Sequence, residues 1–168
     1  MRIHLVATFA LALAAPLAGA CHPVARPTVA VRAEARFAVA QAIAAANAAQ
    51  RDRDLDGYLA TVDAELAASA RAELARDWAT VTAIVDVQRK IAEVSEVTGD
   101  RAVVITELRY ERRVARAGAT DHVLTTGRQE ERWVRRADGW KLAAVKDLGG
   151  ETLVNGRPVA APVATAAN

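Results

Sequence analysis

In the first half of the chain, apolar residues recur every three or four positions, which is the period of an amphipathic helix. Residues 31–50 are rich in alanine and contain no proline or glycine, so they are predicted to form one helix. Asp54 can cap a second, short helix, in which Gly57 is a poor helix former. Ser69 can cap a third helix. The apolar face of that third helix would carry Leu74, Trp78, Val81 and, at its end, Val85.

From about position 91 the helical period gives way to the alternation of β-strands. Residues 91–97 are rich in β-formers, and Thr98-Gly99-Asp100 predicts a turn. Over residues 102–114 apolar and charged side chains alternate, so one face of this strand is expected to be buried. The apolar end of that face carries Val104, Leu108 and Tyr110. We expect it to pack against the first and third helices, through Phe37, Ile43, Leu74 and Trp78.

Two further strands are predicted after a loop over residues 115–121. They span residues 122–136 and 140–148, with a hairpin turn at Asp138-Gly139 between them. Asn155-Gly156 marks one more tight turn. Helices followed by an antiparallel meander predict an α+β fold. The N-terminal helices would pack on the concave side of a curved antiparallel sheet and leave a cone-shaped cavity.

The N-terminus has the pattern of a secretory signal peptide. Arg2 precedes an apolar run, residues 3–15, that is too short to span a membrane. The only cysteine of the chain, Cys21, directly follows the small residues Ala18-Gly19-Ala20. Leu17 to Cys21 resembles the lipobox of bacterial lipoproteins, although alanine stands at position 18 where leucine is usual. The resemblance implies export, cleavage after Ala20 and a lipid at Cys21; the alternative is a free thiol.

The chain is therefore expected to consist of a signal peptide (1–20), an extended tether (21–30), an α+β domain (31–159) and a disordered tail (160–168). No later stretch is apolar enough for a transmembrane helix. The expected location is the periplasm or the outer membrane, with membrane contact only through a lipid at Cys21.

Three segments of the predicted domain carry a family resemblance: residues 45–59, 91–104 and 133–142. They contain a helix break, a Gly-Asp turn and an Asp-Gly hairpin. In these features the chain resembles the nuclear transport factor 2-like superfamily, which includes SnoaL-like and ketosteroid-isomerase-like groups. The resemblance implies a cone-shaped α+β roll. It implies no particular activity, because this fold occurs in enzymes, pocket binders and adaptor domains.

The composition excludes several classes of protein. A net charge of +2 argues against electrostatic binding of nucleic acid. One cysteine and three histidines exclude a disulfide scaffold and a zinc cluster. The chain has no Gly-rich phosphate loop that opens a helix, and we expect neither a metal nor a cofactor.

Charged residues are concentrated in the middle strands, where we expect cross-strand ion pairs on an exposed face. The alternative is a surface for anions such as lipid headgroups. The residues concerned are Arg109, Arg112, Arg113, Arg116, Arg128, Arg132, Arg135 and Arg136, interleaved with Glu107, Glu111, Glu130 and Glu131.

Four aromatic residues are the candidate ligand-binding residues: Tyr58, Trp78, Tyr110 and Trp133. We expect them to border one cavity between the helices and the sheet, since such rings can be buried while a polar atom meets ligand. A steroid-isomerase-like site would need an aspartate base near the end of the second helix, which makes Asp63 the catalytic candidate. The superfamily's catalytic residues do not carry over, because the local motifs differ. An epoxide-hydrolase-like Asp-Arg-Asp relay also stays open.

Three functions remain open at this point. The first is a non-catalytic envelope domain that binds a small apolar or amphipathic ligand, or a protein partner. The second is a small isomerase, dehydratase or hydrolase that uses an acid in the same cavity. The third is a structural envelope component with a filled core. A homodimer stays open as well. An acid within hydrogen-bond reach of a donor in the cavity would favour the enzyme.

Replacing Cys21 with Ala is expected to move the protein from the membrane fraction to the soluble fraction, because the lipid anchor needs the thiol. Fractionation and intact mass measure this, with the wild-type chain as the control. A wild-type N-terminus still at Met1 would contradict export. Soluble mature protein without acyl mass would contradict the lipid alone.

Overall fold

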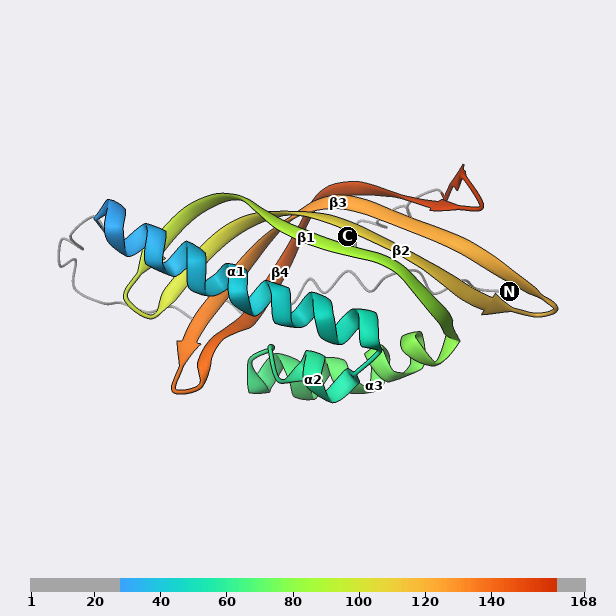
Figure 1. Cartoon of the computed structure of the whole chain (residues 1–168), viewed down its shortest axis with the longest axis horizontal. Coiled ribbons are helices and arrows are strands. Elements are labelled where there is room, and N and C mark those ends of the chain that lie inside the picture. The colour runs from blue at the N-terminus through green and yellow to red at the C-terminus, as the bar shows by residue number, and fades with distance from the viewer. Residues whose placement is uncertain (1–27, 160–168) are drawn as a thin grey trace, which may run out of the picture.

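The computed structural model describes residues 28–159 and contains helices packed against one curved antiparallel sheet (Figure 1). The helices come first: α1 (Val29–Asp52), α2 (Leu55–Leu59) and α3 (Ala64–Thr80). The strands follow: β1 (Val81–Thr98), β2 (Arg101–Arg116), β3 (Ala119–Arg136), β4 (Gly139–Val154) and β5 (Arg157–Pro158). The predicted α+β fold is confirmed. The predicted signal peptide, Cys21 and the predicted tail lie outside the described residues.

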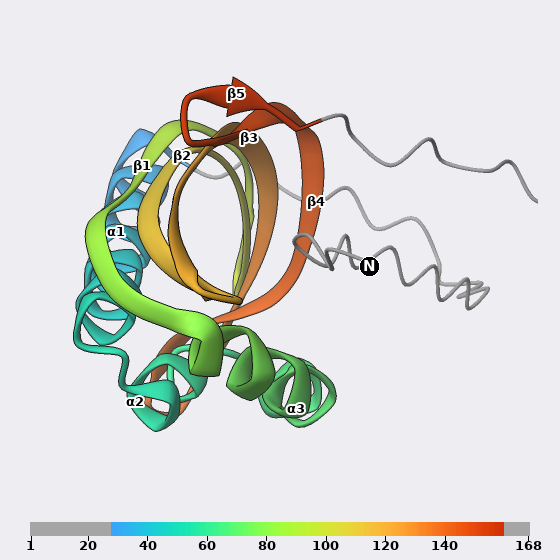
Figure 2. The same cartoon turned by 90° about the vertical axis from the view of Figure 1, so that its right-hand side faces the viewer.

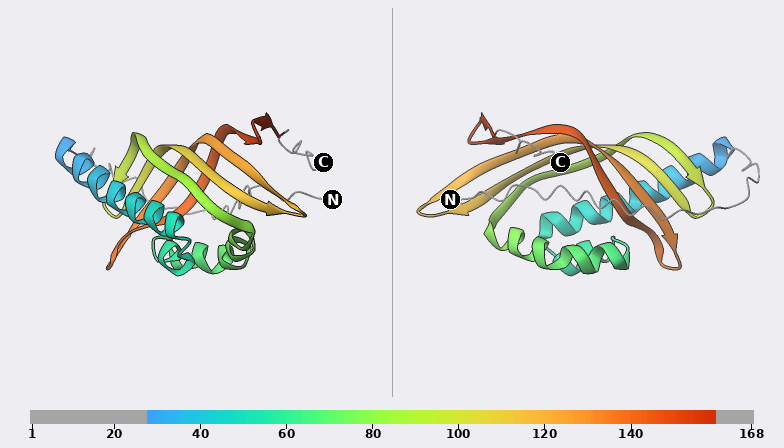
Figure 3. Two further views of the ribbon diagram at one scale, coloured as in Figure 1. Left: turned by 45° about the vertical axis from the view of Figure 1, so that its right-hand side comes forward. Right: turned by 180° about the vertical axis from the view of Figure 1, so that it is seen from behind.

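The sheet is an antiparallel meander in which every strand pairs with its neighbour in sequence, in the order β1-β2-β3-β4-β5. Seen along the strands, it curls around a concave face without closing, with α1 beside β1 and with α2 and α3 below the open side (Figure 2). Two further views show the same arrangement (Figure 3). Within residues 28–159, no helix is both long and apolar enough to cross a membrane.

The core lies between α1 and the concave face of the sheet. One stripe of α1 is buried at helical spacing: Ala35, Val39, Ile43 and Ala46. It packs with residues of all four long strands: Val97, Ala102, Val104, Trp133, Trp140 and Leu142. The helix starts at the Thr28 side chain, which accepts a hydrogen bond from the Val31 amide, and ends at Arg53 in the left-handed conformation.

The junction between α2 and α3 is tied to β4 by backbone hydrogen bonds. The Asp63 amide donates to the Leu142 carbonyl at 2.8 Å, and the Leu142 amide donates to the Thr61 carbonyl at 3.0 Å. Asp54 caps α2 as predicted. The prediction that the third helix starts at Ser69 is wrong, because α3 begins at Ala64. The hydrogen bonds to Leu142 fix the backbone at Asp63, and the alanine-rich segment that follows is helical from its first residue. The Ser69 hydroxyl instead donates to the Leu66 carbonyl within the helix.

The first strand is much longer than predicted. Val81 and Val85 belong to β1 and not to the third helix, which ends at Thr80. Pairing of β1 with the far end of β2, where Val81 faces Val114, holds this segment extended. The many β-branched residues after Thr80 suit a strand, but the charges that follow obscure the alternation.

The other strands also exceed their predicted lengths. The predicted loop 115–121 is a tight turn at Gly118, because β2 and β3 pair almost to their ends. The turn at Asn155-Gly156 is confirmed, and it leads into β5, a fifth strand where the sequence predicted four.

The predicted packing of helices on β2 is confirmed in part. Val104 is fully buried, Leu108 and Tyr110 are half-buried, and Ile43 and Trp78 are buried on the facing helices. The prediction for Phe37 is wrong, because this side chain is 66 % exposed on the outward side of α1.

Two glycines allow β3 and β4 to approach closely beside a bulge. Gly127 pairs with Gly150, and the register shifts at Arg128 and Gln129. A Cβ atom added at Gly150 would lie 2.6 Å from the Gly127 Cα and would also meet the Thr126 carbonyl. Bulges increase the local twist of a sheet, so this close approach contributes to its curl.

Replacing Gly150 with Ala is expected to lower the free energy of unfolding by about 1–3 kcal/mol, because the new methyl group overpacks two backbones. Urea denaturation measures the change. Glu151→Ala, at the exposed next position, is the matched control and should stay within about 0.5 kcal/mol of the wild type. Equal effects of the two replacements would contradict the close approach.

Candidate functional site

Three of the four predicted aromatic residues gather where α2 and α3 face β2. The rings of Tyr58 on α2 and Trp78 on α3 have centroids 5.7 Å apart. On β2, the Arg112 guanidinium lies 4.7 Å from the centre of the Tyr110 ring, a cation–π contact. Tyr58 and Arg112 both interact electrostatically with the Tyr110 hydroxyl, which links the two pairs. We call Tyr58, Trp78, Tyr110 and Arg112 the aromatic cluster.

The hydroxyl of Tyr110 is buried and has no hydrogen-bond partner among residues 28–159. Burial raises the pKa of Tyr110 above its ordinary value; the positive charge of Arg112 opposes this, and the nearby Asp77 adds to it. The hydroxyl therefore keeps its proton at neutral pH and is a donor without an acceptor. Leaving such a group unpaired costs about 1–3 kcal/mol, which a ligand with an acceptor could recover.

Trp133 lies apart from the aromatic cluster. It is 1 % exposed and packs in the core against α1. Its Nε1 donates a hydrogen bond to Glu131 Oε2 at 3.0 Å. The sequence therefore grouped four residues of which the structure brings three together.

A buried carboxylate lies next to Trp133 on the concave face. The Glu131 side chain is fully buried, and its Oε1 accepts a hydrogen bond from Thr106 Oγ1 at 2.9 Å. Arg89 Nη1 pairs with the same oxygen at 3.5 Å. These contacts link β1, β2 and β3. We call Arg89, Thr106, Glu131 and Trp133 the carboxylate cluster.

The prediction that the charged residues of the middle strands lie on an exposed face is wrong for Glu131 and Arg112, which are both buried. The two-residue period of a strand indicates that both side chains point inward. Glu131 is two residues from Trp133, and Arg112 is two residues from Tyr110, so each shares the inward face of its neighbour.

Three more buried polar atoms lack partners within the described chain: Asn47 Oδ1, Arg89 Nε and Arg89 Nη2. In the sheet, Val87 faces Tyr110 and Arg89 faces Leu108, so Arg89 and Tyr110 are diagonal neighbours on one face. Asn47 is one helical turn beyond Ile43 on the buried stripe of α1. Unpaired polar atoms from α1, β1 and β2 therefore face the same interior.

Asp63, the catalytic candidate, lies outside both clusters. It precedes α3 and lines an open pocket of about 340 Å³ with Arg136, Asp138 and Lys141. Arg136 Nε donates a hydrogen bond to Asp63 Oδ1 at 2.7 Å, and this bond lowers the pKa of Asp63 below its ordinary value. A general base works best with a pKa near the operating pH, so this environment disfavours that role.

A second pocket, of about 260 Å³, is a groove between α1 and the edge strand β1. Its lining residues are Arg36, Ala40, Ile43, Arg89, Lys90 and Ile91. The candidate aromatic residues line neither this groove nor the pocket at Asp63. The groove instead lies beside the carboxylate cluster, with which it shares Arg89.

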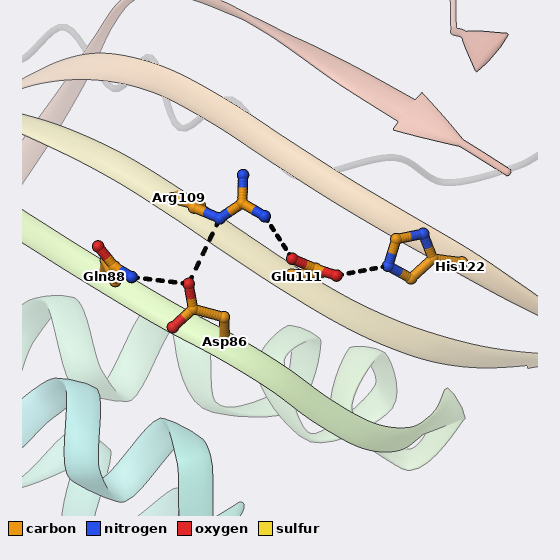
Figure 4. Close-up of polar contacts among 5 residues, drawn as sticks. All are labelled: Asp86, Gln88, Arg109, Glu111 and His122. Carbon is orange, nitrogen blue, oxygen red and sulfur yellow. Dashed lines mark hydrogen bonds and ion pairs between the residues drawn. The ribbon is translucent and has the colours of Figure 1, made fainter. Parts of the chain in front are cut away.

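The opposite face of the sheet carries a row of polar contacts across β1, β2 and β3 (Figure 4). Arg109 bonds to Glu111 and lies 3.3 Å from Asp86, while His122 Nε2 lies 2.8 Å from Glu111. The bond from His122, and after it those from Arg109, lowers the pKa of Glu111. The predicted cross-strand ion pairs are confirmed here. The row is also an acid–arginine–acid arrangement, but its arginine side chain is 44 % exposed.

No metal site is evident in the described part of the chain, where no three histidine, cysteine or acidic side chains come together.

No protein-family model and no curated protein matches the sequence. Solved structures match the fold. A ketosteroid isomerase-like protein from Erwinia carotovora atroseptica superposes with a TM-score of 0.55 at 16 % identity, over 69 % of this chain and 98 % of that one. A type 2 hexachlorocyclohexane dehydrochlorinase gives 0.55 at 13 % identity, over 82 % and 99 %. A protein of the NTF2-like family from Streptomyces avermitilis gives 0.50 at 16 % identity, over 76 % and 99 %.

Replacing Glu131 with Gln is expected to lower the free energy of unfolding by about 3–5 kcal/mol, because Arg89 then keeps a buried charge without its partner. Guanidinium denaturation measures the loss. Glu130→Gln is the matched control: its ion pair with Arg132 is exposed and should contribute at most about 1 kcal/mol.

Adding Arg89→Met to Glu131→Gln should restore part of the lost stability, because both charges are then absent. A Glu131→Gln loss no larger than that of Glu130→Gln would show that the buried pair does not stabilise the fold.

Proposed function

We propose that this chain, which has the NTF2-like fold, binds a small amphipathic ligand on the inner face of its sheet without catalysing a reaction. The apolar part of the ligand would pack on the rings of Tyr58 and Trp78, and its polar group would accept a hydrogen bond from Tyr110. This binding would need limited movement of α2 and α3, because the rings of Tyr58 and Trp78 pack against each other.

The observation that carries this proposal is the buried, unpaired hydroxyl of Tyr110 within residues 28–159. A tyrosine that served packing alone would be better replaced by phenylalanine, since an unpaired buried hydroxyl destabilises the fold. Arg112, also buried, lies over the same ring and adds a positive charge. An aromatic site with a few polar groups that point inward is typical of sites for small molecules.

A non-catalytic role is favoured because the acid–base candidates do not meet at Tyr110. Asp63 is held by Arg136 in the other pocket, and His122 is on the outer face beside Glu111. Both oxygens of Glu131 already accept hydrogen bonds, from Thr106 and Trp133. The homodimer is not needed for this proposal, because all the residues named come from one chain.

A second candidate function is a small enzyme of the isomerase, dehydratase or hydrolase type. Glu131 favours it, because a fully buried carboxylate shares the concave face with Tyr110. Mass analysis of a bound ligand before and after long incubation with the protein separates the two functions. An unchanged ligand supports binding, and a converted ligand supports the enzyme.

We place this binding domain in the cell envelope, exported by the N-terminal signal and anchored through a lipid at Cys21. The support is the order of residues at the N-terminus, where small residues lead directly to the only cysteine. A ligand of the envelope, such as an amphipathic small molecule, would then be within reach of the site.

Replacing Tyr110 with Phe is expected to weaken binding of 2-acetylnaphthalene, a probe with an apolar body and one acceptor, by about tenfold. Binding of 2-ethylnaphthalene, which lacks the acceptor, should not change. Ligand-free Tyr110→Phe should be at least as stable as the wild type, because the replacement removes an unpaired polar group. Isothermal titration and thermal unfolding measure these effects.

The wild type should gain about 2.7 kcal/mol of stability when 2-acetylnaphthalene is present at a hundred times its dissociation constant. Trp78→Ala should lose this gain. The absence of any gain with either naphthalene, together with no ligand that co-purifies, would contradict the proposal and leave a structural component with a filled core.

A further inference from the structure

Arg89 is the most unusual charged side chain on the concave face. It is 7 % exposed, so it is removed from water, yet it has only one charged partner within residues 28–159. Its Nη1 lies 3.5 Å from Glu131, while Nε and Nη2 are buried without any partner in that part of the chain. A buried guanidinium with two unused nitrogens is costly, because each lost its hydrogen bonds to water on folding.

The two unused nitrogens are those that can bind one anion together. In a guanidinium, the N–H bonds of Nε and of the Nη on the same side run parallel and form a fork that matches the two oxygens of a carboxylate. The third nitrogen, Nη1, faces Glu131. Glu131 therefore neutralises Arg89 from one side and leaves the fork free on the other.

The groove between α1 and β1 lies against Arg89. It is lined by Arg89 and, at its rim, by Arg36 and Lys90, with no acidic residue among its lining residues. The remaining lining residues, Ala40, Ile43 and Ile91, are apolar. A groove with cations and an apolar floor suits an anion that has an apolar body, and it disfavours a cationic ligand.

We propose that Arg89 is the anion-binding residue of this domain and that its ligand is an amphipathic monocarboxylate, held by Nε and Nη2. This inference rests on the proposed binding function, and it names the class of ligand. Tyr110 is the diagonal neighbour of Arg89 on the adjacent strand, so both unpaired donors lie on the inner face of the sheet, where the proposed function has its ligand.

The experiment compares 2-naphthoate with 2-naphthamide, which has the same shape and no charge, by isothermal titration of the folded protein. The wild type is expected to bind the carboxylate at least about tenfold more tightly. The Nε–H resonance of Arg89 in a ¹⁵N spectrum, assigned through bonds from the Arg89 backbone, should move with 2-naphthoate and not with 2-naphthamide.

Arg89→Lys keeps the positive charge beside Glu131 but has no fork, so it should lose most of the preference for the carboxylate. Lys90→Gln is the matched control, because it removes a rim charge of the same groove and should leave the preference in place. If Arg89→Lys does not fold, the binding of the two probes and the Arg89 resonance of the wild type still test whether Arg89 binds the carboxylate.

Equal binding of the two probes by the wild type, or an Arg89 resonance that does not move, would overturn the assignment of Arg89 while the binding function stands. If Lys90→Gln abolishes the preference for the carboxylate and Arg89→Lys retains it, the anion binds at the rim of the groove. That result would also overturn the assignment of Arg89. Failure of every naphthalene probe to bind would instead contradict the binding function itself.

Discussion

The buried charge of Glu131 is the constraint on which the concave side of this sheet depends. A carboxylate without contact to water must have its oxygens satisfied by the protein, and here the partners come from three neighbouring strands. Thr106 on β2 and Arg89 on β1 reach Glu131 through the observed register, whereas Trp133 lies two residues away on the same strand. The requirement to satisfy one charge therefore helps to select a single arrangement of β1, β2 and β3, an effect that apolar contacts alone achieve less strictly.

The interior on either side of Glu131 differs in chemistry. Toward the β1–β2 turn, α1 packs small and branched residues against Val97 and Ala102. Toward α2 and α3, aromatic rings and Arg112 cover the sheet. The unpaired atoms of Arg89 and Tyr110 lie on the strands between these regions. Such atoms are the ones that a bound molecule could satisfy, because water does not reach them.

The two faces of the sheet handle charge in opposite ways. On the outer face, the row from Asp86 to His122 is partly exposed and its members pair with one another, so little is gained or lost when a contact breaks (Figure 4). On the inner face, the charges are few and buried, and an unsatisfied donor remains costly. A molecule that satisfies such a donor therefore gains more on the inner face than on the outer face, where each charge already has a partner or water.

The sequence by itself determined the α+β class, α1 to within two residues at each end, the turns at Gly99, Gly139 and Gly156, and the buried face of β2, because periodicity and turn residues are local properties. Only the tertiary structure decided where β1 begins, since its first half is extended by pairing with β2. It also decided which aromatic residues meet and which partners the buried charges have. Glu131 and Glu130 look alike in sequence, but the pleat turns one inward to Arg89 and the other outward to Arg132, and such a difference depends on partners distant in the chain.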